Sequence, residues 1–154
     1  MLEGRIFQIN LSNGGVPKQA RHEAEVTEVG VVGDRQIHTE VHGGPERALC
    51  LYSLERIQEL QSEGNPVFPG AMGENLTVSG LDWSQMQPGL RLQLGNEVLA
   101  EITSFTTPCS SLSSFFRGGN FGRVSQKRFP GWSRVYARVL KGGAVNVADV
   151  VKIV

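Results

Sequence analysis

The stretch LRLQLGNEVLAEITSF, residues 90–105, decides the fold that we expect. In residues 90–94 leucines alternate strictly with polar side chains, which is the pattern of a strand with one buried face. Gly95-Asn96 supplies turn residues, and residues 98–105 supply an antiparallel partner. The stretch therefore predicts a β-hairpin whose second strand leads to Cys109.

Short apolar runs separated by glycine and proline continue on both sides of this hairpin. The 154 residues include 19 Gly and 7 Pro, which divide the apolar runs without forming a low-complexity tract. The other predicted strands cover residues 5–11, 20–32, 48–52, 132–140 and 145–154, and one more follows Gly73. We expect one domain, residues 1–154, with a mainly β fold: a small closed β-barrel of short strands with a few helical inserts.

One segment is typical of a helix. Ser53 is a good N-cap residue, Ile57 and Leu60 recur at helical spacing, and Gly64 is suited to end the helix. A shorter helix is expected around residues 112–116.

Charge and leader features restrict the partners and the compartment. The 15 Lys and Arg residues balance 15 Asp and Glu residues, so neither nucleic acid nor an anionic membrane is an expected partner. The N-terminus lacks a cationic region followed by an apolar run, and no segment approaches transmembrane length, so a soluble cytoplasmic protein is expected. Cys50 and Cys109 are expected to be reduced, with a single bridge between them as the alternative.

Cys109 is the main candidate for chemistry. With Thr107 as N-cap and Pro108 at the first helical position, Cys109 is predicted to lie in the first turn of a helix. There the free backbone N–H groups and the helix dipole would stabilise a thiolate, which can attack, carry sulfur or bind a soft metal. The alternative is a small buried residue, as most free cysteines are.

The histidines give a weaker signal. His38 and His42 are four residues apart, but their surroundings lack a helical pattern and the close ligand pairs of a zinc motif. His22 and His38 are interpreted as surface or hydrogen-bonded residues, whereas His42 is better placed to line a site. A Cys109 nucleophile with His42 as base has no local support.

Two glycine-rich turns and a basic stretch remain. Gly43-Gly44 and residues 70–73 lack the spacing of phosphate-binding loops, so tight turns are their ordinary meaning. Arg47 suits bidentate phosphate binding, with a solvated surface charge as the alternative. The basic residues could form an anion-binding rim around Cys109, or only a solvated loop; they are Arg117, Arg123, Lys127, Arg128 and Arg134.

Taken together, these segments resemble the MOSC domain, named after the C-terminal domain of molybdenum cofactor sulfurase, and its stand-alone bacterial members in particular. The motifs that carry the resemblance occur in the family's order over nearly the whole chain. They are Gly33-Asp34-Arg35-Gln36, residues 42–48 (HGGPERA) with Tyr52-Ser53, residues 70–77 (GAMGENLT), Pro108-Cys109 and residues 131–140 (GWSRVYARVL). One departure is Ala148, where the family usually has glycine before an aspartate.

The resemblance implies a β-barrel that binds molybdenum cofactor, a pterin dithiolene (molybdopterin) bearing a phosphate. In the family the cysteine that matches Cys109 either ligates molybdenum or carries sulfur as a persulfide. The candidate cofactor-binding residues are His42, Gly44, Arg47, Glu74, Asn75, Ser110 and Arg134.

Three hypotheses follow. In the first, the protein is a molybdenum-cofactor oxidoreductase in which Cys109 ligates the metal and N-hydroxylated compounds are reduced, with electrons from a separate reductase. In the second, Cys109 is a persulfide-bearing sulfur carrier that depends on a pyridoxal-phosphate-dependent sulfur donor. In the third, the chain is a non-catalytic binding module with a buried Cys109.

Overall fold

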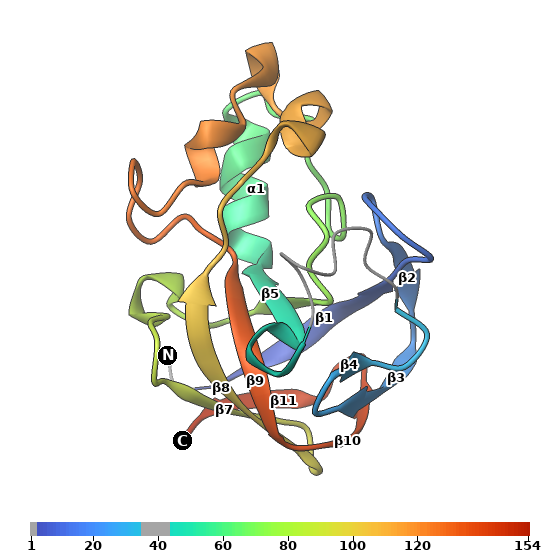
Figure 1. The fold of residues 1–154 in the computed structure, drawn as a ribbon. Helices are drawn as coiled ribbons and strands as arrows, with labels where there is room; N and C mark the ends of the chain where they lie inside the picture. The colour runs from blue at the N-terminus through green and yellow to red at the C-terminus, as the bar shows by residue number, and fades with distance from the viewer. Residues whose placement is uncertain (1–2, 35–43) are drawn as a thin grey trace.

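A closed β-barrel forms the body of the protein (Figure 1). The computed structural model describes residues 3–34 and 44–154. Seven strands close the barrel in the order β11-β7-β8-β9-β5-β6-β1, and β1 pairs with β11 to complete it. They are β1 (Glu3–Leu11), β5 (Leu49–Ser53), β6 (Leu76–Ser79), β7 (Arg91–Leu94), β8 (Val98–Phe105), β9 (Val135–Lys141) and β11 (Val150–Ile153). The predicted small closed barrel is confirmed; β5 and β6 are parallel and the other barrel pairs antiparallel.

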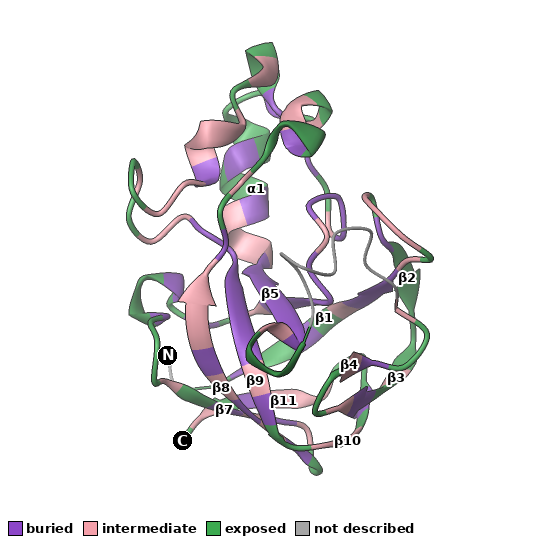
Figure 2. Cartoon of the chain, viewed as in Figure 1, coloured by how far each residue is buried: buried purple, intermediate pink, exposed green. Residues whose placement is uncertain are grey.

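The predicted hairpin is present as β7 and β8. Arg91 lies opposite Glu101 and Leu94 opposite Val98. Leu92 and Leu94 are fully buried, whereas Arg91 is exposed, as the alternation predicts. Strand β5 is instead buried at every position (Figure 2), which agrees with its continuous apolar run.

The prediction of one continuous strand over residues 20–32 is wrong, because this segment forms three short strands. It consists of β2 (Gln19–Arg21), β3 (Glu23–Thr27) and β4 (Gly30–Val31), and β3 forms a second sheet with β4 and β10 (Gly143–Asn146). The chain reverses after Thr27, because Gly30 has a φ of 143° and the Thr27 hydroxyl donates to the Gly30 carbonyl at 2.8 Å.

Two predicted strands near the C-terminus also differ from the structure. Residues 145–154 form β10 and β11 with a turn between them, because Ala148 has a φ of 77° and ends the extended backbone. Strand β9 begins at Val135, later than the predicted start at residue 132.

The predicted helix is confirmed as α1 (Leu54–Ser62). The Ser53 hydroxyl accepts from the Arg56 N–H at 3.1 Å, and Gly64 follows the last turn with a φ of 94°. The described residues also form five short 3-10 helices: η1 (Pro45–Arg47), η2 (Trp83–Gln85), η3 (Ser110–Phe115), η4 (Arg117–Gly119) and η5 (Phe121–Val124). Helix α1 and the segment containing η3 to η5 stand together at one end of the barrel (Figure 1).

Aromatic and cationic side chains hold this end in place. The Trp132 ring lies between the guanidinium groups of Arg56, at 4.3 Å, and Arg123, at 3.9 Å. Arg123 also pairs with Glu63 through two hydrogen bonds of 2.8 and 2.9 Å. These contacts join α1 to the chain before β9.

Candidate functional site

Cys109 lies at the end of an extended arm, residues 106–109, that continues β8. The Thr106 N–H donates to the Arg134 carbonyl at 3.0 Å, and the Ser133 hydroxyl donates to the Thr106 carbonyl at 3.2 Å. Thr106 and Ser133 are both buried. The arm is therefore held by the segment just before β9.

The prediction that Cys109 lies in the first turn of a helix is wrong. Helix η3 begins at Ser110, and Cys109 is its N-cap residue with extended φ and ψ of −131° and 172°. The hydrogen bond between the Thr106 N–H and the Arg134 carbonyl holds the chain extended before η3. Thr107 and Pro108 therefore lie outside the helix. A six-residue 3-10 helix also supplies far less dipole than the predicted α-helix start.

Both cysteines are free, but their environments differ. Cys109 is exposed, so the alternative of a buried Cys109 is wrong; the buried thiol is Cys50. Burial raises the pKa of the Cys50 thiol to about 11. Only Cys109 is open to reagents and ligands, and its Sγ lies 2.8 Å from the Ser111 Oγ.

Arg47 is positioned by η1. Gly44 precedes this turn with a φ of 78°, a conformation that favours glycine, and it is exposed. The Arg47 guanidinium lies 5.5 Å from the centre of the Tyr136 ring. No carboxylate within residues 3–34 or 44–154 pairs with it. Among those residues, none is a hydrogen-bond partner of its side-chain N–H donors either, and such donors suit an anion.

Tyr136 lies near both Arg47 and Cys109, and the sequence analysis did not select it as a site residue. Burial raises its pKa, and the charges of Cys50, Arg134, Arg47 and Cys109 also act on it. The phenol thus lies within electrostatic reach of both Arg47 and Cys109, which are far apart in sequence. A tyrosine within the buried run 135–137 of β9 was the signal that could have identified it.

Glu74 and Arg134 lie below the surface. The Glu74 carboxylate accepts from the Gly70 N–H and the Thr77 hydroxyl, each at 3.0 Å, and burial raises its pKa. The Arg134 guanidinium donates to the Met72 carbonyl at 2.7 Å. Arg134 therefore connects the turn at residues 70–73 to the Cys109 arm, since its own carbonyl binds Thr106.

The turn at residues 70–73 confirms the ordinary interpretation of its glycines. Gly70 has a φ of 88°, and a Cβ there would lie 2.8 Å from the Lys18 carbonyl oxygen. Glycine is required by packing against the chain, because the turn faces protein at this position.

Both the oxygen and the nitrogen of the Asn75 side-chain amide form hydrogen bonds within the protein. Its Oδ1 accepts from the Cys50 N–H, and its Nδ2 donates to Asp34, each at 2.9 Å. Asp34 is in turn bound by the buried Lys18 at 2.6 Å. The side chain of Asn75 holds β5 and Asp34 in place.

The remaining predicted residues fall into three groups. Ser110 is exposed beside Cys109, and His22 is exposed in the bend between β2 and β3. Five of the predicted or motif residues lie outside the described residues: Arg35, Gln36, His38, His42 and Gly43. The prediction that His42 lines a site therefore stays a prediction. Of the predicted anion-binding rim, Arg123 is bound to Glu63 and Arg134 is buried, so neither forms a free rim.

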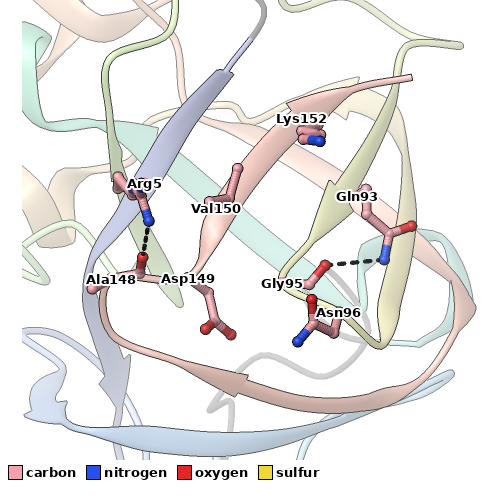
Figure 3. Close-up of a pocket in the computed structure, with 8 residues that line it drawn as sticks. All are labelled: Arg5, Gln93, Gly95, Asn96, Ala148, Asp149, Val150 and Lys152. Atoms are coloured by element: carbon pink, nitrogen blue, oxygen red, sulfur yellow. Dashed lines mark hydrogen bonds between the residues drawn. The ribbon is translucent and has the colours of Figure 1, made fainter.

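A polar pocket of about 580 Å³ lies away from these residues (Figure 3). Its wall comes from β1, β11 and the ends of β7, and it includes Arg5, Gln93, Asp149 and Lys152. None of the predicted site residues lines it. In the described part of the chain, no three His, Cys, Asp or Glu residues are grouped as metal ligands, and no helix is long and apolar enough to cross a membrane.

Comparison with known proteins agrees with this architecture. The family model of the MOSC domain matches residues 38–152. The chain belongs to the MOSC domain family. This MOSC domain is 33% identical to Protein YiiM of Escherichia coli over 112 residues, which are 70% of this chain and 50% of that protein. It is 32% identical over 130 residues to a Gibberella moniliformis protein named Reductase, covering 80% of this chain and 22% of that one.

The solved structures agree with the barrel. The crystal structure of YiiM from Escherichia coli matches the MOSC domain with a TM-score of 0.74 at 24% identity, over 100% of this chain and 70% of that chain. At this identity the similarity concerns the fold. The chain spans about half the length of the curated bacterial relatives that it matches.

Proposed function

We propose that this MOSC domain binds molybdenum cofactor with Cys109 as the sulfur ligand of the metal, and that it supports two-electron reduction of N-hydroxylated compounds. The observation that carries the proposal is the exposed Cys109 thiol at the end of an arm pinned by Ser133 and Arg134. A soft sulfur ligand on a fixed arm suits molybdenum.

The residues present fit the cofactor in charge and donor type. The Arg47 guanidinium pairs with no carboxylate among the described residues, and its N–H donors suit a phosphate. Among the described residues, three buried atoms have no hydrogen-bond partner: the Glu74 Oε1, the Thr106 Oγ1 and the Arg134 Nε. Such atoms are rare in folded proteins. Thr106 belongs to the Cys109 arm and Arg134 to the segment that holds it, so their unpaired atoms support a polar ligand at this end of the barrel.

Each residue has a distinct role in this proposal. The bound cofactor supplies the two-electron redox chemistry. Cys109 binds the metal, and Arg47 binds the phosphate through parallel N–H donors. Arg134 and Ser133 fix the arm, and Tyr136 keeps its phenolic proton because burial raises its pKa.

The oxidoreductase assignment also rests on the relative named Reductase. The chain spans 22% of that protein, so the electron source is proposed to be a separate reductase. The substrate class comes from the family resemblance.

Metal and pterin analysis tests the proposal. Protein purified from a host that makes the cofactor is expected to contain stoichiometric molybdenum, which Cys109→Ser abolishes. Cys50→Ala is the matched control, because Cys50 is buried and has no proposed contact with the metal. Retention of molybdenum by Cys109→Ser would exclude ligation through this thiol.

A sulfur carrier is the second candidate, and the exposure of Cys109 favours it because a partner enzyme must reach the sulfur. This function predicts cyanide-releasable sulfur on Cys109 after incubation with a pyridoxal-phosphate-dependent sulfur donor. It also predicts purified protein without molybdenum.

A further inference from the structure

The hydroxyl of Ser111 faces the sulfur of Cys109. The two atoms are 2.8 Å apart, and both residues are exposed. Cys109 occupies the N-cap position of η3, but its side chain accepts no backbone N–H there. Among the described residues, the Cys109 side chain forms its hydrogen bond with Ser111.

The chemistry of the two groups decides the direction of this hydrogen bond in the working protein. A thiol S–H is a weak donor, whereas a hydroxyl O–H is a good one. A metal-bound thiolate or a persulfide carries negative charge and has no proton on the terminal sulfur to donate. The hydroxyl must then donate, and the bond is charge-assisted.

We propose that Ser111 is a positioning residue that donates its hydroxyl proton to the negatively charged sulfur of Cys109 and holds the direction in which that sulfur faces. The inference rests on the proposed function only in taking Cys109 as the working sulfur. It adds a specific partner outside the ligand itself, of the kind that orients metal ligands and adjusts the charge on them.

The first experiment uses the purified protein without cofactor and measures the rate of Cys109 alkylation by iodoacetamide at one fixed pH near neutrality. Ser111→Ala is expected to slow the reaction roughly threefold, because the attacking sulfur loses the hydroxyl that stabilises its negative charge and holds its direction. Ser111→Thr keeps the hydroxyl and is expected to restore the rate. Ser114→Ala is the matched control, because Ser114 lies in the same helix η3 and its exposed hydroxyl makes no hydrogen bond with the described residues.

Three outcomes would overturn the inference. They are an unchanged or faster rate in Ser111→Ala, an equal loss in Ser114→Ala, and no recovery in Ser111→Thr. A faster rate would mean that the thiol is the donor in this pair. Cys50 does not contribute to the alkylation rate, because it is buried in the barrel. A circular dichroism spectrum equal to that of the parent protein verifies the fold of each variant.

The second experiment uses protein loaded with cofactor and measures molybdenum content and midpoint potential. Ser111→Ala is expected to lower the potential, because a sulfur without its hydrogen bond donates more electron density and favours the oxidised metal. An equal potential in Ser111→Ala and the parent contradicts the inference. Absence of molybdenum from the parent protein contradicts the proposed function instead, and the alkylation rates still decide the role of Ser111.

Discussion

Replacement of Ala148 by glycine is expected to stabilise the protein. Ala148 is the non-glycine residue with positive φ in the described chain, at 77°, and it lies in the turn between β10 and β11. Its N–H donates to the Ile6 carbonyl at 2.8 Å, and the Ile6 N–H donates to the Asp149 carbonyl at 2.9 Å. These bonds between β1 and the turn hold Ala148 in the left-handed region.

The expected gain follows from two opposing effects. A left-handed conformation costs an L-residue with a Cβ about 1–2 kcal/mol, and glycine removes this cost. Glycine also makes the unfolded chain more flexible, which costs about 0.5–1 kcal/mol. Ala148 is exposed, so little packing is lost with its methyl group. The net gain is about 0.5–1 kcal/mol, or roughly 1–4 °C in Tm for a chain of this size.

Urea and thermal unfolding measure this change directly. Ala144→Gly is the matched control, because Ala144 is also exposed but lies within β10. There glycine is expected to destabilise by about 0.5–1 kcal/mol, so the two variants should change in opposite directions. If Ala148→Gly destabilises as much as Ala144→Gly, the strain assigned to Ala148 does not exist.

Three further predictions concern the candidate site. Arg47→Ala should weaken cofactor retention by removing a charge-assisted bond of about 1.5–3 kcal/mol, measured by molybdenum loss on dialysis; unchanged retention refutes the phosphate role. Burial raises the pKa of the Glu74 carboxyl above its ordinary value of 4.5, so the folded state binds the carboxyl proton more tightly than the unfolded state does. The free energy of unfolding should therefore fall as the pH rises from 4.5 through the raised pKa of the folded state. Glu74→Gln should lose this part of the pH dependence of urea unfolding, and an identical slope would argue against it. At pH 8, iodoacetamide should modify Cys109 alone, because the pKa of Cys50 is about 11; mass spectrometry that finds Cys50 labelled in folded protein contradicts its burial.

The elements predicted correctly depend on neighbouring residues. Alternation in residues 90–94 identifies a strand because one side of the sheet is buried. The Ser53 cap and the spacing of Ile57 and Leu60 identify α1, because a helix brings residues three apart onto one face. The order of short motifs identified the MOSC domain before any contact was known.

The errors occur where distant contacts control the backbone. The Cys109 arm stays extended because Thr106 binds the carbonyl of Arg134, 28 residues later, and no local signal reveals this bond. The turn at Ala148 is likewise imposed by Ile6 at the other end of the chain. Alanine carries no signal for a left-handed conformation, so the break between β10 and β11 was missed.

The sequence by itself determined the strand and helix types, the family, and the choice of Cys109 and Arg47 as candidate site residues, because local periodicity and ordered motifs carry that information. Only the tertiary structure decided which side chains are free for chemistry. It exposes Cys109, engages the amide of Asn75 with Cys50 and Asp34, and buries the guanidinium of Arg134. Hydrogen-bond partners far apart in sequence meet only when the barrel closes, and those partners determine the role of each polar residue.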